Sequence, residues 1–252
     1  MVRRPSRRMA DGIVTHIDRS PVDVELAFEQ HAGYVRALAA AGWAIHEVEP
    51  ADELPDSAFV EDAVVVCDGL AVLTRPGAPE RVAEVAGAER AARELGLDIA
   101  RIEAPGTLDG GDVLQVGDTV YVGRGGRTNA EGIRQLRRHA ATRGRTVVPV
   151  RLTGVLHLKS AVTALPDGTV VGYPPLVDDP SVWRSFLPVP EEGGSHVVVL
   201  APSTVLMAAS APRSRELFEA RGLRTVVVDI SEYEKLEGCV TCLSVRLRGS
   251  LA

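Results

Sequence analysis

The apolar residues of this chain gather in short runs that are broken by tight turns. Three stretches, at 63–74, 113–123 and 161–172, each hold two apolar runs around such a turn. A short turn of Asp and Gly between apolar runs is a strong local signal for a β-hairpin. The three turns are evenly spaced: Gly69 of the first turn lies 49 residues before Asp118 of the second, which lies 49 residues before Asp167 of the third. The spacing predicts one supersecondary unit that repeats along the chain.

Between the hairpins the apolar residues recur every three to four positions, which predicts amphipathic helices. These helical patterns cover 24–39, 82–95 and 133–140, and a further helix is predicted after Pro212, which suits a first turn. Thr128 and Glu131 fit a capping box. A glycine, the residue that most easily ends a helix in the left-handed conformation, follows each predicted helix: Gly42, Gly96, Gly144 and Gly222.

The repeat predicts a ring, because one hairpin and helix cannot bury an apolar face without neighbours. A fourth strand pair is expected at 197–208, with its turn near Pro202. The fifth unit would pair a strand at 13–16 with a C-terminal strand at 240–247 and so close the ring. No linker or change in composition divides the chain. We therefore predict a single α/β domain over residues 1–252, of which residues 1–11 form a mobile segment leading into a loop.

A polar cluster opens each of the three hairpins. The clusters read FVED at 59–62, LDGGD at 108–112 and HLKS at 157–160. If the units surround an axis, these positions converge and bring carboxylates, the imidazole of His157 and a C-terminal cysteine, Cys242, to one place. The sequence thus predicts a site at the centre of the ring.

The three cysteines call for different interpretations. Cys67 lies in the apolar run VVVC and is most simply a small buried residue. Cys239 and Cys242 form a C-x-x-C, which could bind zinc, act as a redox dithiol or supply a nucleophile. A structural zinc site usually needs four ligands, and a redox pair is expected at the start of a helix. We favour Cys242 as a nucleophile, provided that an imidazole and acids reach it.

Composition and charge limit the remaining possibilities. The chain has 252 residues, is 45% hydrophobic and carries a net charge of −6 with both signs interspersed, which argues against a nucleic-acid partner. No apolar stretch is long enough to span a bilayer, and no signal peptide is indicated. The arginines at positions 3, 4, 7 and 8 are expected to be solvated. An odd number of cysteines fits a reducing compartment, so a cytoplasmic location is predicted.

Two other sequence patterns fall short of known motifs. The glycine-rich segment 121–129 has Thr128 where a dinucleotide-binding fingerprint needs its third glycine, and it lacks the Gly-Lys-Ser/Thr of a P-loop. The chain also contains no G-x-S-x-G nucleophile elbow. We expect neither a nucleotide cofactor nor a serine nucleophile.

Taken together, the motifs resemble one family over nearly the whole chain. FVED, LDGGD, Arg127-Thr128-Asn129, LHLKS and the terminal Gly-x-x-Thr-Cys ending at Cys242 are similar, in order and spacing, to those of the dimethylarginine dimethylaminohydrolases. The resemblance implies the pentein fold, a five-bladed α/β propeller of ββαβ-like units. It also implies hydrolysis of asymmetric dimethylarginine or monomethylarginine to citrulline and a methylamine, without metal or organic cofactor.

The resemblance also implies roles for individual residues. Cys242 would be the nucleophile, His157 the general acid and base, and Asp109, with Asp62, would hold the guanidinium. Further substrate-binding residues follow from the family: Glu61 beside these acids, Asp56, Arg81 and Arg127 at the amino-acid end of the substrate, and the chain at Ile13, in a lid loop, and at Val240.

The sequence leaves other functions open, both other enzyme activities and non-catalytic binding. Arginine deiminase, agmatine deiminase and amidinotransferase share the superfamily, and some penteins are non-catalytic binding proteins. Arg81 and Arg127 favour a substrate with a carboxylate, and retention of the cysteine, histidine and acids favours an enzyme. The partner is predicted to be a small molecule, with no membrane, and a homodimer is left open.

Overall fold

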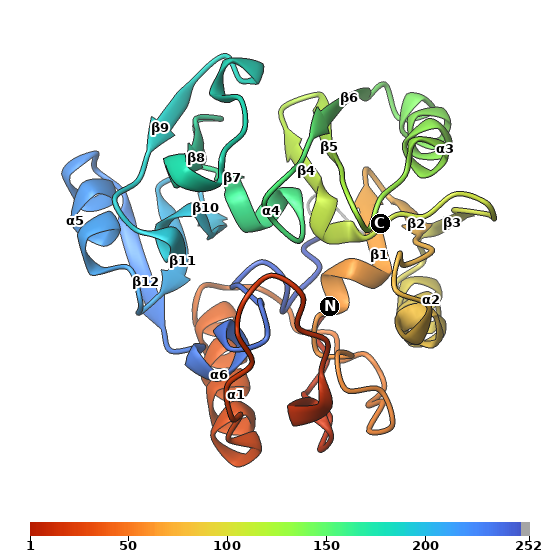
Figure 1. Cartoon of the computed structure of the whole chain (residues 1–252), viewed down its shortest axis with the longest axis horizontal. Helices are drawn as coiled ribbons and strands as arrows, with labels where there is room; N and C mark the ends of the chain where they lie inside the picture. The colour runs from red at the N-terminus through yellow and green to blue at the C-terminus, as the bar shows by residue number, and fades with distance from the viewer. Residues whose placement is uncertain (248–252) are drawn as a thin grey trace.

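The computed structural model describes residues 1–247, so the last five residues of the predicted domain lie outside the described residues. Four three-stranded sheets stand around the middle of the molecule, as Figure 1 shows. In every sheet the first two strands are antiparallel and the third runs parallel to the second. The sheets comprise β1 (Val64–Cys67), β2 (Leu70–Leu73) and β3 (Asp98–Arg101); β4 (Val113–Val116), β5 (Thr119–Arg124) and β6 (Thr146–Arg151); β7 (Val162–Ala164), β8 (Val170–Gly172) and β9 (Phe186–Pro188); and β10 (Val197–Ala201), β11 (Thr204–Ala208) and β12 (Arg224–Val228).

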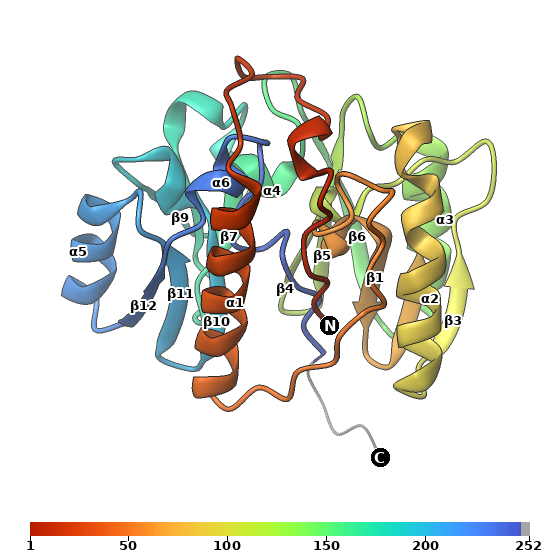
Figure 2. The ribbon, with the colours of Figure 1, turned by 90° about the horizontal axis from the view of Figure 1, so that it is seen from below.

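Three helices, at 85–94, 130–141 and 212–220, lie on the outside of this ring and connect the second strand of a sheet to the third (Figures 1 and 2). In the β7–β9 unit two short 3-10 helices replace the long helix. The helices are α1 (Val24–Ala40), α2 (Val85–Glu94), α3 (Ala130–Ala141), α4 (Leu158–Ala161), α5 (Pro212–Ala220) and α6 (Ser231–Glu234), and the 3-10 helices are η1 (Met9–Asp11), η2 (Val60–Ala63), η3 (Pro79–Glu84), η4 (Gly110–Asp112), η5 (Pro174–Leu176), η6 (Pro180–Val182) and η7 (Glu192–Ser195).

The predicted turns and helix ends are largely confirmed. Asp68 and Gly69 both have positive φ, 46° and 79°, as the two-residue loop joining β1 to β2 requires. The four glycines expected after the long helices all have positive φ, between 69° and 89°. The capping box at Thr128 is wrong, because the side chain of Asn129 accepts the N–H of Gly132 and caps α3.

The predicted fifth strand pair is also wrong. Neither 13–16 nor 240–247 forms a strand. Backbone groups of these segments bond to side chains instead: Ile13 N–H to Asp56, and the carbonyls of Thr241 and Ser244 to the guanidinium of Arg246. The fifth position in the ring holds α1 and α6 (Figure 1). The backbone pairing here is isolated: the amino and carbonyl groups of Met1 bond to the carbonyl and N–H of Val245, and Val2 forms a parallel bridge with Glu47.

The hydrophobic core is divided into clusters between neighbouring units. One cluster joins β1 and β2 to β4 and β5, the next joins β4 to β7, and another joins β7 and β8 to β10 and β11. A fourth cluster packs β10, β11 and β12 against α1. A fifth packs β1 and β2 against the segments around Val48 and Val245. The fifth unit is therefore packed into the ring although it has no sheet.

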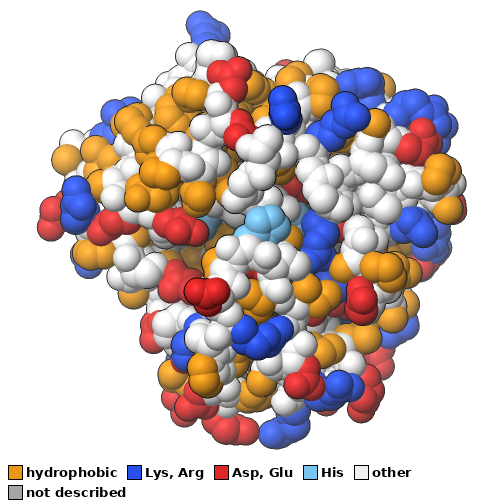
Figure 3. Space-filling model, in the orientation of Figure 1, with side chains coloured by type: hydrophobic (Ala, Val, Ile, Leu, Met, Phe, Trp, Pro, Cys, Tyr) orange, Lys and Arg blue, Asp and Glu red, His pale blue; other side chains and the backbone are white. Residues whose placement is uncertain are grey.

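The N-terminal segment differs from the prediction of a solvated arginine-rich end. Arg3 is 1% exposed and donates to the carbonyl oxygens of Ser57 and Glu84, and Met9 is fully buried. Arg7 and Arg8 are exposed as expected. On the face drawn in Figure 3, acidic and basic side chains are interspersed, with a histidine near the centre. Within residues 1–247, the structure has no helix that is both long and apolar enough to span a membrane.

Candidate active site

The three polar clusters occupy equivalent places, in the short helical turns η2, η4 and α4 that precede β1, β4 and β7. Hydrogen bonds run directly between them. Asp62 Oδ1 accepts the N–H of Gly111 at 2.8 Å, and Asp109 Oδ2 lies 3.0 Å from His157 Nε2. The N–H of Glu61 donates to the carbonyl of Cys242 at 3.2 Å. The predicted convergence at the centre of the ring is thereby confirmed.

His157 is 4% exposed and surrounded by carboxylates. Besides Asp109 at Nε2, Asp62 Oδ1 lies 3.9 Å from Nδ1. Burial alone opposes the positive charge, but the charge of Asp62, the hydrogen bond to Asp109 and the charge of Asp112 raise the pKa of His157 to about 9. The imidazole is therefore protonated at neutral pH and can act as an acid.

Asp109 is held in place from two further directions. Its Oδ1 accepts the N–H of Gly77 at 2.7 Å, and its own N–H donates to Oγ1 of Thr128 at 3.2 Å. With no exposure to solvent, its carboxylate is fixed against the imidazole. A carboxylate that orients the ring of a catalytic histidine is a recurring arrangement in hydrolases.

Asp112, the last residue of the LDGGD cluster, has no role predicted from the sequence but also lies in this site. It is fully buried, and its Oδ1 accepts the N–H of Leu158, the residue after His157. Burial raises the pKa of Asp112 to about 6. Its place at the end of the LDGGD cluster, directly before β4, was the only signal for it.

Arg81 is predicted to bind the substrate, and the structure buries it in an ion-pair network. Its Nη1 lies 2.6 Å from Asp62 Oδ2, and Nε and Nη2 bond to both carboxylate oxygens of Glu84. Although burial opposes ionisation, His157 and Arg81 lower the pKa of Asp62 to about 2. Glu84, which had no motif to mark it, is thus the residue that positions Arg81.

Cys242 is 8% exposed and lies in a turn after α6, not in the strand that was expected. Its Sγ is 3.2 Å from Sγ of Cys239. The hydrogen bond to Cys239, burial and the charges of Cys239, Glu61 and Asp62 raise the pKa of the Cys242 thiol. The neighbouring Cys239 and the acids thus oppose the thiolate form of Cys242.

One small cavity joins most of the predicted site residues. Its lining includes Cys242, His157, Asp62 and Arg81, together with the predicted ligands of the substrate's amino-acid end: Asp56, Arg127 and Ile13. Arg127 has a single ion-pair contact, 3.9 Å from Asp109, and so keeps donors free to bind a ligand more readily than Arg81 does.

Asp109, which the resemblance assigns to the guanidinium, does not line this cavity, and neither do two further predicted substrate-binding residues. Val240 is fully buried, and its carbonyl accepts the hydroxyl of Tyr34 at 2.8 Å. Glu61 faces a separate 420 Å³ channel, where its Oε1 lies 2.6 Å from Lys159 Nζ and 3.0 Å from Arg246 Nη2. A direct contact of either with substrate stays a prediction.

The loop around Ile13 is attached above the cavity by two carboxylates. The N–H of Ile13 donates to Asp56, whose pKa burial raises, and Glu237 accepts the N–H groups of Thr15 and His16 at 2.6 and 2.9 Å. Glu237 also lines the cavity and was missed, since an isolated glutamate near Gly238 carries no sequence signal. The arrangement fits the expected lid.

Among residues 1–247, the acids that could bind a metal are Asp62 and Asp109 together with His157, whose ligand atoms lie within 4.8 Å of one another. Each is already engaged: Asp62 by Arg81 and Gly111, and Asp109 by Gly77 and the imidazole. The cationic side chains of Arg81 and His157 thus already neutralise these carboxylates, and catalysis without metal remains our prediction.

Comparison with known proteins finds relatives over nearly the whole chain. The N(G),N(G)-dimethylarginine dimethylaminohydrolase of Streptomyces coelicolor is 61% identical over 248 residues, which are 98% of this chain and 96% of the relative. The structure of DDAH from Pseudomonas aeruginosa, a Cys-to-Ser mutant complexed with citrulline, is 36% identical with a TM-score of 0.90 and covers 98% of this chain and 97% of that chain. A His-to-Gly dimethylarginine dimethylaminohydrolase solved as an adduct with S-methyl-L-thiocitrulline is 35% identical, with a TM-score of 0.91 and 98% of each chain covered. No family model matches.

Proposed function

Because the chain belongs to the N(G),N(G)-dimethylarginine dimethylaminohydrolase family, we propose that it hydrolyses N-omega-methylated arginines to citrulline and dimethylamine or methylamine. The observation that carries the proposal is the cavity in which Cys242, His157 and Asp62 meet, with Asp109 bonded to the imidazole. The citrulline complex and the thiocitrulline adduct of the two solved relatives agree with this product and with covalent chemistry.

Recognition of the substrate's guanidinium is assigned to Asp62 and Asp109. A planar cation is best fixed by carboxylates that accept its N–H groups side by side, which leaves its central carbon open to attack from above. Arg81 already places a guanidinium 2.6 Å from Asp62, which supports the chemical fit of this carboxylate. The substrate would share or take over that position.

The opposite end of the substrate is assigned to the groups below the lid. Asp56 and the backbone at Ile13 suit an α-ammonium, and Arg127 suits the α-carboxylate, because each lines the same cavity. Arg81 keeps few free donors beyond its bonds to Glu84 and Asp62, so Arg127 is the stronger of the two anchors.

The chemical step uses the sulfur of Cys242 and the protonated imidazole of His157. Entry of a cationic substrate beside Cys242 favours the thiolate, since a nearby positive charge lowers the pKa of a thiol. The thiolate attacks the guanidinium carbon, and the C–N bond to the methylated nitrogen breaks as His157 donates its proton to the departing amine. This leaves a thiouronium on Cys242.

Hydrolysis of that intermediate completes the reaction. The neutral imidazole now accepts a proton from water as the water oxygen attacks the thiouronium carbon. The C–S bond of the adduct then breaks as its hydroxyl proton passes to the sulfur, which releases citrulline and the Cys242 thiol. Asp109, at 3.0 Å, stabilises the imidazolium whenever it forms. One imidazole thus acts first as acid and then as base.

The proposal extends to the properties of the whole protein. We expect a small-molecule substrate, no nucleic-acid partner, a cytoplasmic location and, where the protein associates, a homodimer. Sedimentation of the purified protein measures the association state.

Citrulline release from the purified protein tests the proposal, with asymmetric dimethylarginine, monomethylarginine, arginine and agmatine offered in parallel. We expect turnover of the methylated substrates above that of arginine, and a loss of at least about 10³-fold in Cys242→Ser. Preferred turnover of arginine or agmatine would reassign the substrate, and unchanged turnover in Cys242→Ser would disprove the nucleophile. No turnover at all would favour a binding protein.

A further inference from the structure

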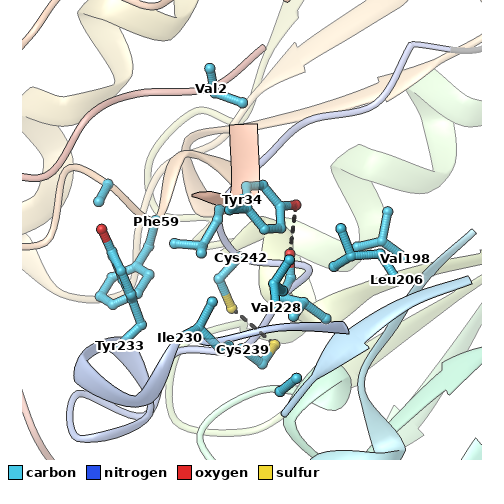
Figure 4. Close-up of a cluster of buried hydrophobic side chains, with 14 of the residues drawn as sticks. Val2, Tyr34, Phe59, Val198, Leu206, Val228, Ile230, Tyr233, Cys239 and Cys242 are labelled. Carbon is cyan, nitrogen blue, oxygen red and sulfur yellow. Dashed lines mark hydrogen bonds between the residues drawn. The ribbon is translucent and has the colours of Figure 1, made fainter. Parts of the chain in front are cut away.

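Two thiols face one another directly behind the cavity. Cys239 Sγ and Cys242 Sγ are 3.2 Å apart, and Figure 4 shows the contact between them within a cluster of buried hydrophobic side chains. The N–H of Cys242 donates to the carbonyl of Cys239 at 3.1 Å, so a tight turn separates the two residues.

This turn suits a disulfide. An i to i+3 hydrogen-bonded turn holds its end Cα atoms within about 7 Å, and a disulfide needs Cα atoms about 4.4–6.8 Å apart. The sulfurs then have to approach only from 3.2 Å to bonding distance. Thr241 Oγ1, 3.2 Å from Cys239 Sγ, holds that side chain toward its partner.

The two cysteines differ in their access to small molecules. Cys242 lines the substrate cavity, whereas Cys239, 4% exposed, does not line it. A small oxidant that enters by the substrate's route therefore meets Cys242 first. The thiol of Cys239 is then the nearest group that can react with an oxidised Cys242.

We propose that Cys239 is a resolving thiol, and that hydrogen peroxide converts the pair into a Cys239–Cys242 disulfide that reversibly inactivates the enzyme. This rests on the proposed role of Cys242 as the nucleophile. The Cys242 thiolate attacks the peroxide, the O–O bond breaks, and a sulfenic acid and hydroxide form. The Cys239 sulfur then attacks the sulfenic sulfur, the S–O bond breaks, and the released hydroxide takes up the Cys239 proton as water.

A metal site and a dithiol oxidoreductase both fit the C-x-x-C less well. A metal site is disfavoured because neither cysteine belongs to the group of potential metal ligands found among the described residues. A dithiol oxidoreductase is disfavoured because the pair follows the short helix α6 and does not begin a helix, and Cys239 is buried from a partner protein.

The disulfide has a consequence for damage to the protein. A sulfenic acid that finds no thiol proceeds to sulfinic and sulfonic acids, which ordinary thiols do not reverse. With Cys239 at 3.2 Å, capture within the molecule competes with this second oxidation. Inactivation by peroxide is then recoverable with a dithiol reductant.

The experiment treats the purified protein and its Cys239→Ser variant with hydrogen peroxide and follows citrulline release and intact mass. Serine preserves a hydrogen-bonding group beside Cys242 but cannot form a disulfide. We expect the unchanged protein to lose its activity and, at the same time, the mass of two hydrogen atoms. Dithiothreitol should restore both the activity and the mass. Cys239→Ser should gain oxygen atoms on Cys242, and its loss of activity should resist dithiothreitol.

Cys67→Ser is the matched control, because Cys67 is also buried and lies in β1, outside the cavity lining. It should behave as the unchanged protein does. Loss of activity without a peptide linked through Cys239 and Cys242 would overturn the proposal. A disulfide that forms while dimethylarginine turnover continues would instead overturn the role of Cys242 as nucleophile, so the two failures are distinguishable.

Discussion

At the scale of single residues, the site depends on how its buried charges are paired with charges of the opposite sign. Asp109 and Asp62 lie on opposite nitrogens of His157, while Arg81 lies on the far side of Asp62. Each charge is buried and each has a partner of the other sign, which is the condition under which buried charges persist. The substrate's cation must therefore enter an arrangement that is already neutralised, where its charge would favour the thiolate of Cys242 against the nearby acids.

The raised pKa of His157 predicts a pH dependence of stability. The imidazolium gains its partners on folding, so its contribution is fully present below the ordinary pKa of 6.5 and is lost as pH rises through about 9. Over that window the shift corresponds to roughly 3 kcal/mol. Urea denaturation at several pH values between 6 and about 10 measures it. In His157→Gln this portion of the dependence should disappear; an unchanged profile would show that another group causes it.

At the scale of elements, short local signals decide where each helix and hairpin ends. Gly144 follows α3 with φ of +69° and nothing within 4 Å of a built Cβ, so its role is conformational alone. Gly33 lies inside α1 in ordinary helical conformation, where a glycine only weakens the helix. Glycine therefore stabilises the fold at position 144 and destabilises it at position 33.

The two glycines form a matched pair of predictions. Gly144→Ala should lower the free energy of unfolding by about 1 kcal/mol, because the methyl group disfavours the left-handed conformation. Gly33→Ala should raise it by about 0.5–1 kcal/mol, since its Cβ meets only the end of Arg36 at 3.7 Å. Denaturant midpoints at constant slope measure both. Equal effects of the two substitutions would contradict this account.

At the scale of the whole molecule, the ring is held by contacts between units. The core clusters lie between neighbouring units, and the ends of the chain are joined through Met1 and Val245. Near the centre, Glu61 links η2 to α4 through Lys159 and to the C-terminal segment through Arg246. Glu61 therefore connects three parts of the chain that are distant in sequence.

Removing that carboxylate should affect stability more than substrate binding. Glu61→Ala leaves the buried Lys159 and the partly buried Arg246 without their anion, and loss of one partner of a buried ion pair typically costs about 3–5 kcal/mol. The denaturant midpoint should fall, while KM for dimethylarginine stays near its original value in the fraction that remains folded. Lys159→Met, which leaves Arg246 to pair with Glu61, is the milder comparison. A raised KM at unchanged stability would show that Glu61 contacts substrate, as the family resemblance implies.

Much of this protein was determined by local sequence. The hairpin turn at Asp68-Gly69 and the glycine at 144 act over a few residues, and their spacing predicted the repeated units. The polar residues that open the hairpins could be assigned to one site because equivalent positions in a ring converge. Their grouping around His157 is confirmed.

The rest was decided by contacts between segments far apart in the chain. The residues at 13–16 bond to Asp56 and Glu237, and those at 240–247 bend around Arg246, so the fifth sheet does not form. Glu84 and Asp112 gain their importance only from burial beside other charges. No periodic pattern encodes these pairings, because desolvation and ionic partners exist only once the chain has folded.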